Sequence, residues 1–213
     1  MPNHCNNIIT VSGPSKELRR FFSAVASEKS VFDFNKILPC PKELFEHGSP
    51  VRIMTQEEIL QMWEKHRQLN KGEHSSLTRP HGLGITKERQ SELIARFGYD
   101  NWYNWCCKNW GTKWGAYDVQ EWTWVTERTI TTSYDSAWAP PTNGLVKLSK
   151  LFPLLSFRNC FMETGMDFCG YDVIENGEVT EEDEDKISSD TGLKFCEERF
   201  GYEPYEDDES VPV

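Results

Sequence analysis

The side chains of this chain that could do chemistry are cysteines, histidines and carboxylates, and their spacing matches no catalytic or metal-binding motif. Seven cysteines and five histidines occur, without a Cys-x-x-Cys pair or a zinc-type spacing. His4 and Cys5 are adjacent, but neighbours in a strand point to opposite faces, which argues against a thiol nucleophile with its own base. Glu163 and Asp167 flank a glycine and are expected to be solvated acids of a hairpin loop. We therefore expect no enzyme activity, no metal and no cofactor.

Composition and length indicate the class of protein and its compartment. The chain has 213 residues, 38% of them apolar and 27% charged, which is typical of one soluble globular domain or one domain with a large insertion. The odd number of cysteines favours free thiols in a reducing compartment. The start of the chain does not look like a signal peptide, and no run of about 18–20 apolar residues occurs that could span a bilayer. We expect a cytoplasmic protein with no membrane partner.

The net charge of −11 lies entirely in the C-terminal part of the chain. Residues 176–213 hold 14 acidic and 3 basic side chains, including the runs 181–185 and 206–209. Between these runs, Leu193, Cys196 and Phe200 recur at helical spacing. We predict an acidic C-terminal extension over 181–213 with one short helix, acting either as a solvated tail or as a surface for a basic partner. The sign of the charge disfavours sequence-independent DNA binding.

Hydrophobic periodicity in the first half predicts a strand, a helix, a second strand and then a helical insertion. The first strand is expected at 6–11, the first helix after Pro14, and the second strand at 31–34. The insertion covers about 41–115, with helices that start after a Thr55–Glu58 capping box, at Thr86 and at Asp100. Its third helix, which carries three tryptophans, is read as a core wedge between insertion and sheet, the alternative being a platform for stacking bases.

The second half returns to strands. We expect strands at 129–134, 154–163 and 168–175, a helix after the corner at 137–141, and an Asn-Gly hairpin turn at 176–177. A phase change near Gln120 predicts a bulge or turn there. Two strand–helix–strand units with an insertion between them predict an α+β, ferredoxin-like split βαβ sandwich with an antiparallel sheet, in a single domain over 1–180.

Several long blocks of the sequence match a known family. They are residues 1–7, 98–105, 110–114, 137–141 and 163–168. Together these blocks resemble the YubB-type ferredoxin-like domain family, which is carried by conjugative plasmids, bacteriophages and bacterial mobile islands. The resemblance implies a fold and a genomic habitat, but it brings no established activity. The segment 122–128 and the acidic C-terminal residues depart from the family pattern.

If the protein has a binding site, we expect it where these matched blocks converge. The candidates are Asn3, Cys5, Asn7, Lys113, Trp114, Trp138, Glu163 and Met166. Amides, a cation, a carboxylate and two indoles suit a small polar ligand, with the indoles as walls. The alternative is that Trp114 and Trp138 are core residues and that the asparagines cap turns.

Three functions remain open from the sequence. The favoured hypothesis is a mobile-element accessory protein that binds a host macromolecule without catalysis, with a host protein as the expected partner and counter-defence as a possible role. The alternative is a nucleotide-binding or sequestering module that uses the Trp, Asn and Lys side chains. The third is an enzyme whose site the motifs do not reveal. Fold alone does not choose among them.

Overall fold

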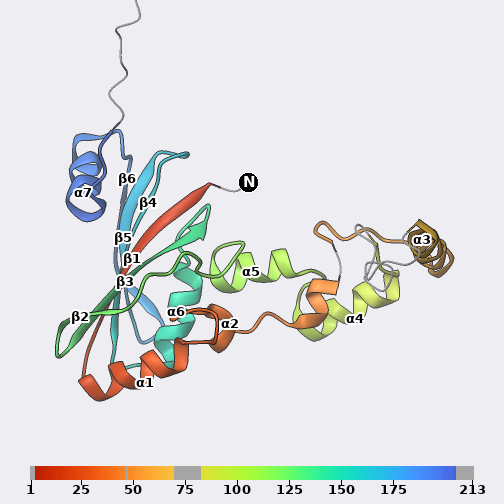
Figure 1. Cartoon of the computed structure of the whole chain (residues 1–213), viewed down its shortest axis with the longest axis horizontal. Helices are drawn as coiled ribbons and strands as arrows, with labels where there is room; N and C mark the ends of the chain where they lie inside the picture. The colour runs from red at the N-terminus through yellow and green to blue at the C-terminus, as the bar shows by residue number, and fades with distance from the viewer. Residues whose placement is uncertain (1–2, 47, 70–82, 205–213) are drawn as a thin grey trace, which may run out of the picture.

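The computed structural model describes residues 3–46, 48–69 and 83–204, which form an antiparallel sheet, flanking helices and a helical arm (Figure 1). In chain order the elements are β1 (His4–Ser12), α1 (Ser15–Val25), α2 (Phe34–Ile37), the 3-10 helix η1 (Lys42–Glu46), α3 (Gln56–Leu69), α4 (Lys87–Phe97), α5 (Trp102–Trp110), β2 (Thr123–Thr126), β3 (Thr129–Ala137), α6 (Thr142–Leu151), β4 (Ser156–Glu163), β5 (Phe168–Glu175), β6 (Glu178–Asp185) and α7 (Asp190–Phe200). None of the helices in these ranges is long and apolar enough to cross a membrane.

The six strands lie in the order β2-β3-β1-β4-β5-β6, and every neighbouring pair is antiparallel. The first four of these strands, with α1 and α6, reproduce the split βαβ arrangement of the ferredoxin-like fold, since β1 lies between the parallel strands β3 and β4. The hairpin β5–β6 then widens the sheet beyond β4. The α+β fold class with an antiparallel sheet is therefore confirmed.

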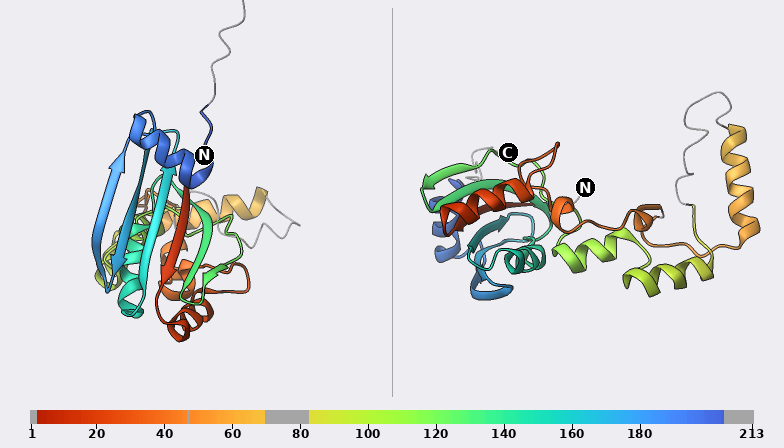
Figure 2. Two further views of the ribbon diagram at one scale, coloured as in Figure 1. Left: turned by 90° about the vertical axis from the view of Figure 1, so that its left-hand side faces the viewer. Right: turned by 90° about the horizontal axis from the view of Figure 1, so that it is seen from below.

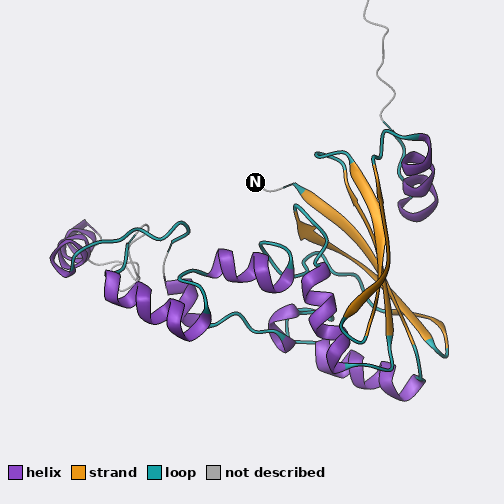
Figure 3. Ribbon diagram, turned by 180° about the vertical axis from the view of Figure 1, so that it is seen from behind, coloured by secondary structure: helices purple, strands orange, loops and turns teal. Residues whose placement is uncertain are grey.

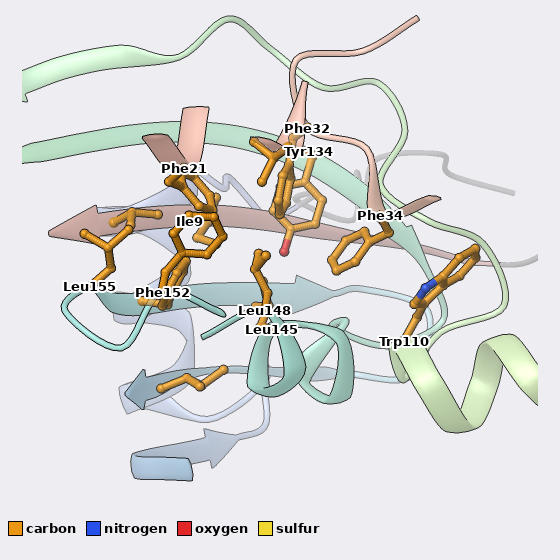
Figure 4. Close-up of a cluster of buried hydrophobic side chains, with 14 of the residues drawn as sticks. Ile9, Phe21, Phe32, Phe34, Trp110, Tyr134, Leu145, Leu148, Phe152 and Leu155 are labelled. Atoms are coloured by element: carbon orange, nitrogen blue, oxygen red, sulfur yellow. The ribbon is translucent and has the colours of Figure 1, made fainter. Parts of the chain in front are cut away.

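One face of the sheet packs on α1, α2, α5 and α6, and this side holds the main core (Figure 4). Alternation along the strands sends Ile9, Tyr134 and Phe157 to this face, where the ring of Phe21 lies 5.5 Å from that of Phe157. On the opposite face, α7 covers the ends of β4 and β5 through a second cluster (Figure 3). This cluster consists of Met162, Cys169, Ile187 and Cys196.

The strand expected at 31–34 is wrong. Residues 31–33 are irregular, and α2 begins at Phe34 because Asp33 caps it, accepting a hydrogen bond of 2.9 Å from the Asn35 amide. Phe32 and Phe34 alternate as they would in a strand, but both rings point into the same core and lie 5.1 Å apart. The second strand of the split βαβ unit is β2, which follows the insertion, so the helical insertion lies between α1 and β2.

The first acidic run lies inside the sheet, whereas the sequence analysis placed it in an extension that starts at residue 181. Glu181–Asp185 belong to β6, whose backbone pairs with β5 from Cys169 to Glu175. The acidic side chains of this edge strand are exposed, apart from the half-buried Asp185, so a run of charges is compatible with strand pairing. The expected hairpin turn precedes it, with Asn176 and Gly177 both at positive φ. The second run, 206–209, lies outside the described residues.

The helices η1, α3 and α4 form an arm that extends away from the sheet (Figure 2). The capping box of α3 is confirmed, since the Thr55 amide donates to Glu58 Oε2 (2.7 Å) and the Glu58 amide donates to Thr55 Oγ1 (3.2 Å). Leu44 of η1 and Leu93 of α4 are fully buried, whereas Ile94 of α4 is 47% exposed. The loop expected at 71–84 lies mostly outside the described residues.

The tryptophan-bearing helix α5 joins this arm to the body. Its cap is Asn101, whose Oδ1 accepts a hydrogen bond from the Asn104 amide, and not Asp100 as expected. Trp110 is buried and donates its Nε1 hydrogen to the Leu38 carbonyl (3.0 Å), while Trp102 and Trp105 pack on the rim of the main core. The core interpretation of this helix is therefore confirmed. The irregularity expected near Gln120 is confirmed, since the register against β3 shifts between the Tyr117–Asp135 bridge and Thr123–Thr131, and a second shift follows between Trp124 and Thr126.

Candidate binding surface at one end of the sheet

The antiparallel topology brings most of the sequence-predicted site residues to one end of the sheet. The start of β1 lies beside the ends of β3 and β4, and the start of β5 lies beside the end of β4. The residues gathered there are Asn3, Lys113, Trp114, Trp138, Glu163 and Met166, which we call the sheet-end cluster. Cys5 and Asn7 lie beneath it, inside the molecule.

A buried threonine fastens the loop after α5 to the end of β3. Thr112 Oγ1 donates to the Ala137 carbonyl (2.7 Å) and accepts from the Ala137 amide (3.0 Å). The loop begins at Gly111, whose positive φ of 89° ends α5 in the left-handed conformation that glycine adopts without strain. This clamp places Lys113 and Trp114 next to Trp138, although 24 residues separate Trp114 from Trp138 in the chain.

The Lys113 ammonium lies over two indole rings. Its Nζ is 4.7 Å from the centre of the Trp114 ring and 5.0 Å from that of Trp138. Both tryptophans remain accessible, with exposed fractions of 41% and 38%. Among the described residues no carboxylate forms an ion pair with Lys113. A cation placed over two aromatic faces favours contact with an anionic group that bears a planar or apolar body.

Trp138 has a backbone conformation that is rare for a bulky residue. Its φ is +69°, in the left-handed region, which costs about 1–3 kcal/mol for a residue other than glycine. Two hydrogen bonds hold this corner in place: the Trp138 amide donates to the Asn3 carbonyl (3.0 Å), and Ser136 Oγ donates to the Ala139 carbonyl (2.7 Å). From α5, Tyr103 packs edge-on against the indole at 6.2 Å. The surrounding structure thus stabilises an exposed indole in one orientation.

Glu163 has a structural task in this cluster. Its side chain is buried and accepts hydrogen bonds from the Gly165 amide (2.9 Å) and the Met166 amide (2.7 Å), so it caps the turn between β4 and β5. Asn3 packs on the same turn, because a Cβ atom at Gly165 would lie 2.3 Å from Asn3 Nδ2. Asp167 does not pair with Glu163 but accepts from the Ser188 amide and hydroxyl, which lowers its pKa.

Cys5 and Asn7 support the cluster from below. Asn7 Nδ2 donates to the Cys5 carbonyl (2.8 Å) and to Ser136 Oγ (2.9 Å), and its Oδ1 accepts from Asn159 Nδ2 (3.0 Å). The hydroxyl of Tyr134 completes this buried chain by donating to Asn159 Oδ1 (2.9 Å). Burial raises the pKa of the Cys5 thiol to about 12, so this sulfur remains protonated and is a poor nucleophile. Both residues are positioning residues rather than contact residues.

Some residues of this region were not among the site candidates predicted from the sequence. Tyr103 read as one face of a helix, and Tyr117 as part of a strand, yet their rings pack against Trp138 and Trp114 respectively. Tyr117 also contacts His4 Nδ1 through its hydroxyl (2.9 Å). Thr112 lies in the matched block 110–114, but its clamping role was not predicted, since its partner Ala137 is distant in the chain. No group of three or more His, Cys, Asp or Glu side chains within the described ranges could hold a metal ion.

One family model agrees with the ferredoxin-like fold. Residues 109–209 match a family model described as a ferredoxin-like domain in Api92-like protein. This Api92-like match covers just under half of the chain and includes Lys113, Trp114, Trp138, Glu163 and Met166. A crystal structure of protein api92 from Yersinia pseudotuberculosis is similar at 14% identity with a TM-score of 0.45, over 89% of this chain and 100% of that one. No curated protein matches the chain.

Proposed function

We propose that this chain is a non-catalytic binding protein that contacts a host protein through the sheet-end cluster. The single observation that carries the proposal is Trp138, an exposed indole held at positive φ beside the Lys113 ammonium. Tryptophan is one of the residue types enriched at the energetic centres of protein interfaces. Strained, well-supported residues of this kind occur where the strain serves a function.

The chemistry of the other groups supports a binding role over a catalytic one. The Glu163 carboxylate already accepts two backbone hydrogen bonds, and the Cys5 thiol stays protonated at neutral pH. Neither group is therefore available as a base or nucleophile. The sequence blocks that resemble the YubB-type family, with its plasmid and phage habitat, support a mobile-element accessory protein whose partner belongs to the host and lies in the cytoplasm, with counter-defence as its role.

A capture experiment with two matched tryptophan variants tests this proposal. The immobilised chain is exposed to a bacterial lysate, and the bound proteins are quantified by mass spectrometry for the wild type, Trp138→Ala and Trp124→Ala. Trp124 lies on edge strand β2 and is 42% exposed, so Trp124→Ala removes an indole of similar exposure at a different place. We expect Trp138→Ala to bind the captured protein at least about tenfold less, as for an interface hot spot, and Trp124→Ala to bind it normally.

Equal capture by both variants, or no protein enriched by the wild type, would contradict this function. Thermal unfolding of each variant must be cooperative, so that a misfolded Trp138→Ala is not counted as a loss of binding. Trp138→Phe provides a second variant that keeps an aromatic ring, and it should bind with intermediate strength.

A second candidate function, nucleotide binding or sequestration, is favoured by the arrangement of Lys113 between two indoles. An ammonium suits a phosphate group and an indole suits a base, and their combination would bind both parts of one ligand. We expect linear or cyclic nucleotides to change the tryptophan fluorescence of the wild type and of Lys194→Met, an exposed lysine of α7, but not of Lys113→Met. A wild type whose fluorescence does not respond would rule out this candidate.

A further inference from the structure

Helix α3 presents an apolar face at the far end of the arm, away from the sheet (Figures 1 and 3). None of its residues is fully buried. Ile59, Met62 and Trp63 follow the i, i+3, i+4 spacing of one helical face and are half-buried, while Leu60 and Leu69 at its borders are 58% and 75% exposed. A helix with such a stripe gains stability when a second surface covers it.

The charges that border this face change sign along the helix. Glu58 lies in the first turn and Lys65 lies two turns later, on the same border of the apolar stripe because seven residues span about two turns. Neither side chain forms an ion pair among the described residues. Glu58 uses one oxygen, Oε2, for the capping box. Both side chains are exposed.

We propose that α3 pairs antiparallel with α3 of a second copy of this chain, forming a two-fold symmetric dimer through the arm tips. Reversing one copy places Glu58 opposite the partner's Lys65, and Lys65 opposite the partner's Glu58. The centre of this register falls between positions 61 and 62, so the two Met62 side chains lie next to the two-fold axis, with Ile59 and Trp63 on either side. One arrangement therefore satisfies both the apolar stripe and the charged border.

The order of Glu58 and Lys65 along α3 favours a second copy of this chain as the surface that covers the apolar stripe. A two-fold interface must be self-complementary, so each patch needs both signs of charge placed symmetrically about its centre. The midpoint between Glu58 and Lys65 falls beside Met62, which is also the centre of the apolar stripe. A helix of 14 residues is about 21 Å long. An interface of this size is small, so a dimer that dissociates at micromolar concentrations or above is expected.

Charge exchange between two variants of the full-length chain tests this pairing by sedimentation velocity over a range of protein concentrations. The wild type should shift from monomer to dimer as its concentration rises. Lys65→Glu places two pairs of like charges across the interface, as does Glu58→Lys, and each variant alone should remain monomeric. Mixed in equal amounts, the two variants have complementary borders and should form a heterodimer.

Two controls separate this pairing from a loss of helix. Lys194→Glu changes the same type of charge on α7, far from the arm, and should leave the dimer unchanged. Glu58→Gln retains a group that can accept the Thr55 amide hydrogen bond, so it should preserve helix content by circular dichroism yet weaken the dimer. A wild type that stays monomeric at every concentration, or variants whose mixture fails to associate, would overturn the proposal and leave the face to a different partner.

Discussion

The side chain of Asn7 lies in a buried chain of hydrogen bonds that joins the three central strands. Tyr134 donates to Asn159, Asn159 donates to Asn7, and Asn7 donates to Ser136, whose own hydroxyl donates to the corner that presents Trp138. β1 and β4 each contribute one polar side chain to this network, and β3 contributes two, Tyr134 and Ser136. Because these groups satisfy one another, they specify the strand register at little cost in stability.

Loss of the central amide should cost more than loss of a terminal hydroxyl. Tyr134→Phe removes a single donor and should lower the free energy of unfolding by about 1 kcal/mol, whereas Asn159→Ala leaves both the Tyr134 hydroxyl and the Asn7 carbonyl oxygen without partners and should cost about 2–3 kcal/mol. Urea unfolding at neutral pH measures both values. Equal costs would show that the network does not act as a chain.

The buried carboxyl of Asp172 makes stability depend on pH in a defined direction. Desolvation raises its pKa above the ordinary value of 3.8, although the Thr142 hydroxyl donates to it. Above pH 3.8 the unfolded chain releases this proton while the folded chain retains it, so this group lowers the stability as pH rises toward its folded pKa. Asp172→Asn, which cannot ionise, should therefore gain stability relative to the wild type between pH 4 and pH 7 in urea unfolding. If the difference in free energy of unfolding between Asp172→Asn and the wild type is the same at pH 4 and at pH 7, the pKa of Asp172 is not raised.

At the scale of elements, β6 shows that an acidic run can belong to a sheet. Its edge position leaves every carboxylate in contact with solvent, and its backbone needs only β5 as a partner. The pairing is close at Gly170, where a Cβ atom would lie 2.0 Å from the Asp183 carbonyl oxygen. The absence of a side chain at this position thus allows the highly charged strand to join the sheet.

Gly170→Ala should therefore detach part of β6 from β5. We expect faster amide hydrogen exchange over 181–185 and a loss of about 1–3 kcal/mol in stability. Gly115→Ala is the matched control, because its Cβ atom would meet the Phe34 Cβ at an ordinary 3.5 Å. If exchange over 181–185 is equally fast in the wild type, the run is not a paired strand.

At the scale of the whole molecule, the arm gives the chain an extended shape. η1, α3 and α4 extend away from the sheet, and Arg96 of α4 pairs with Glu43 of η1 at 3.0 Å (Figure 2). Leu44 of η1 and Leu93 of α4 belong to the same buried cluster as the sheet-facing core, so this cluster anchors the base of the arm to the body. The shape places the proposed pairing helix far from the sheet-end cluster, so a dimer leaves that cluster accessible.

Small-angle X-ray scattering should detect this arm. A compact chain of 213 residues has a radius of gyration of about 17 Å. We expect a clearly larger radius of gyration. It should be measured at low protein concentration, where the monomer dominates, or with Lys65→Glu, which is expected to remain monomeric. A radius of about 17 Å would mean that the arm folds back on the sheet.

The sequence by itself determined the elements whose signals are local. Leu18 and Phe21 recur at helical spacing and face the core, Thr55 and Glu58 cap a helix, and Asn176-Gly177 turns a hairpin, because each signal involves residues within a few positions. These local elements, in order, were enough to predict the α+β fold. The matched blocks were also enough to predict six residues that meet at one end of the sheet.

Only the tertiary structure decided which strands pair and which side chains meet across the chain. Phe32 and Phe34 alternate equally well in a strand and in an irregular segment on a core, and the charges of Glu181–Asp185 suit a tail as well as an edge strand. The orientation of Trp138 depends on Asn3 and Ala139, and that of Lys113 on a clamp between Thr112 and Ala137. Contacts between residues distant in sequence form only once the sheet has assembled, so no local pattern records them.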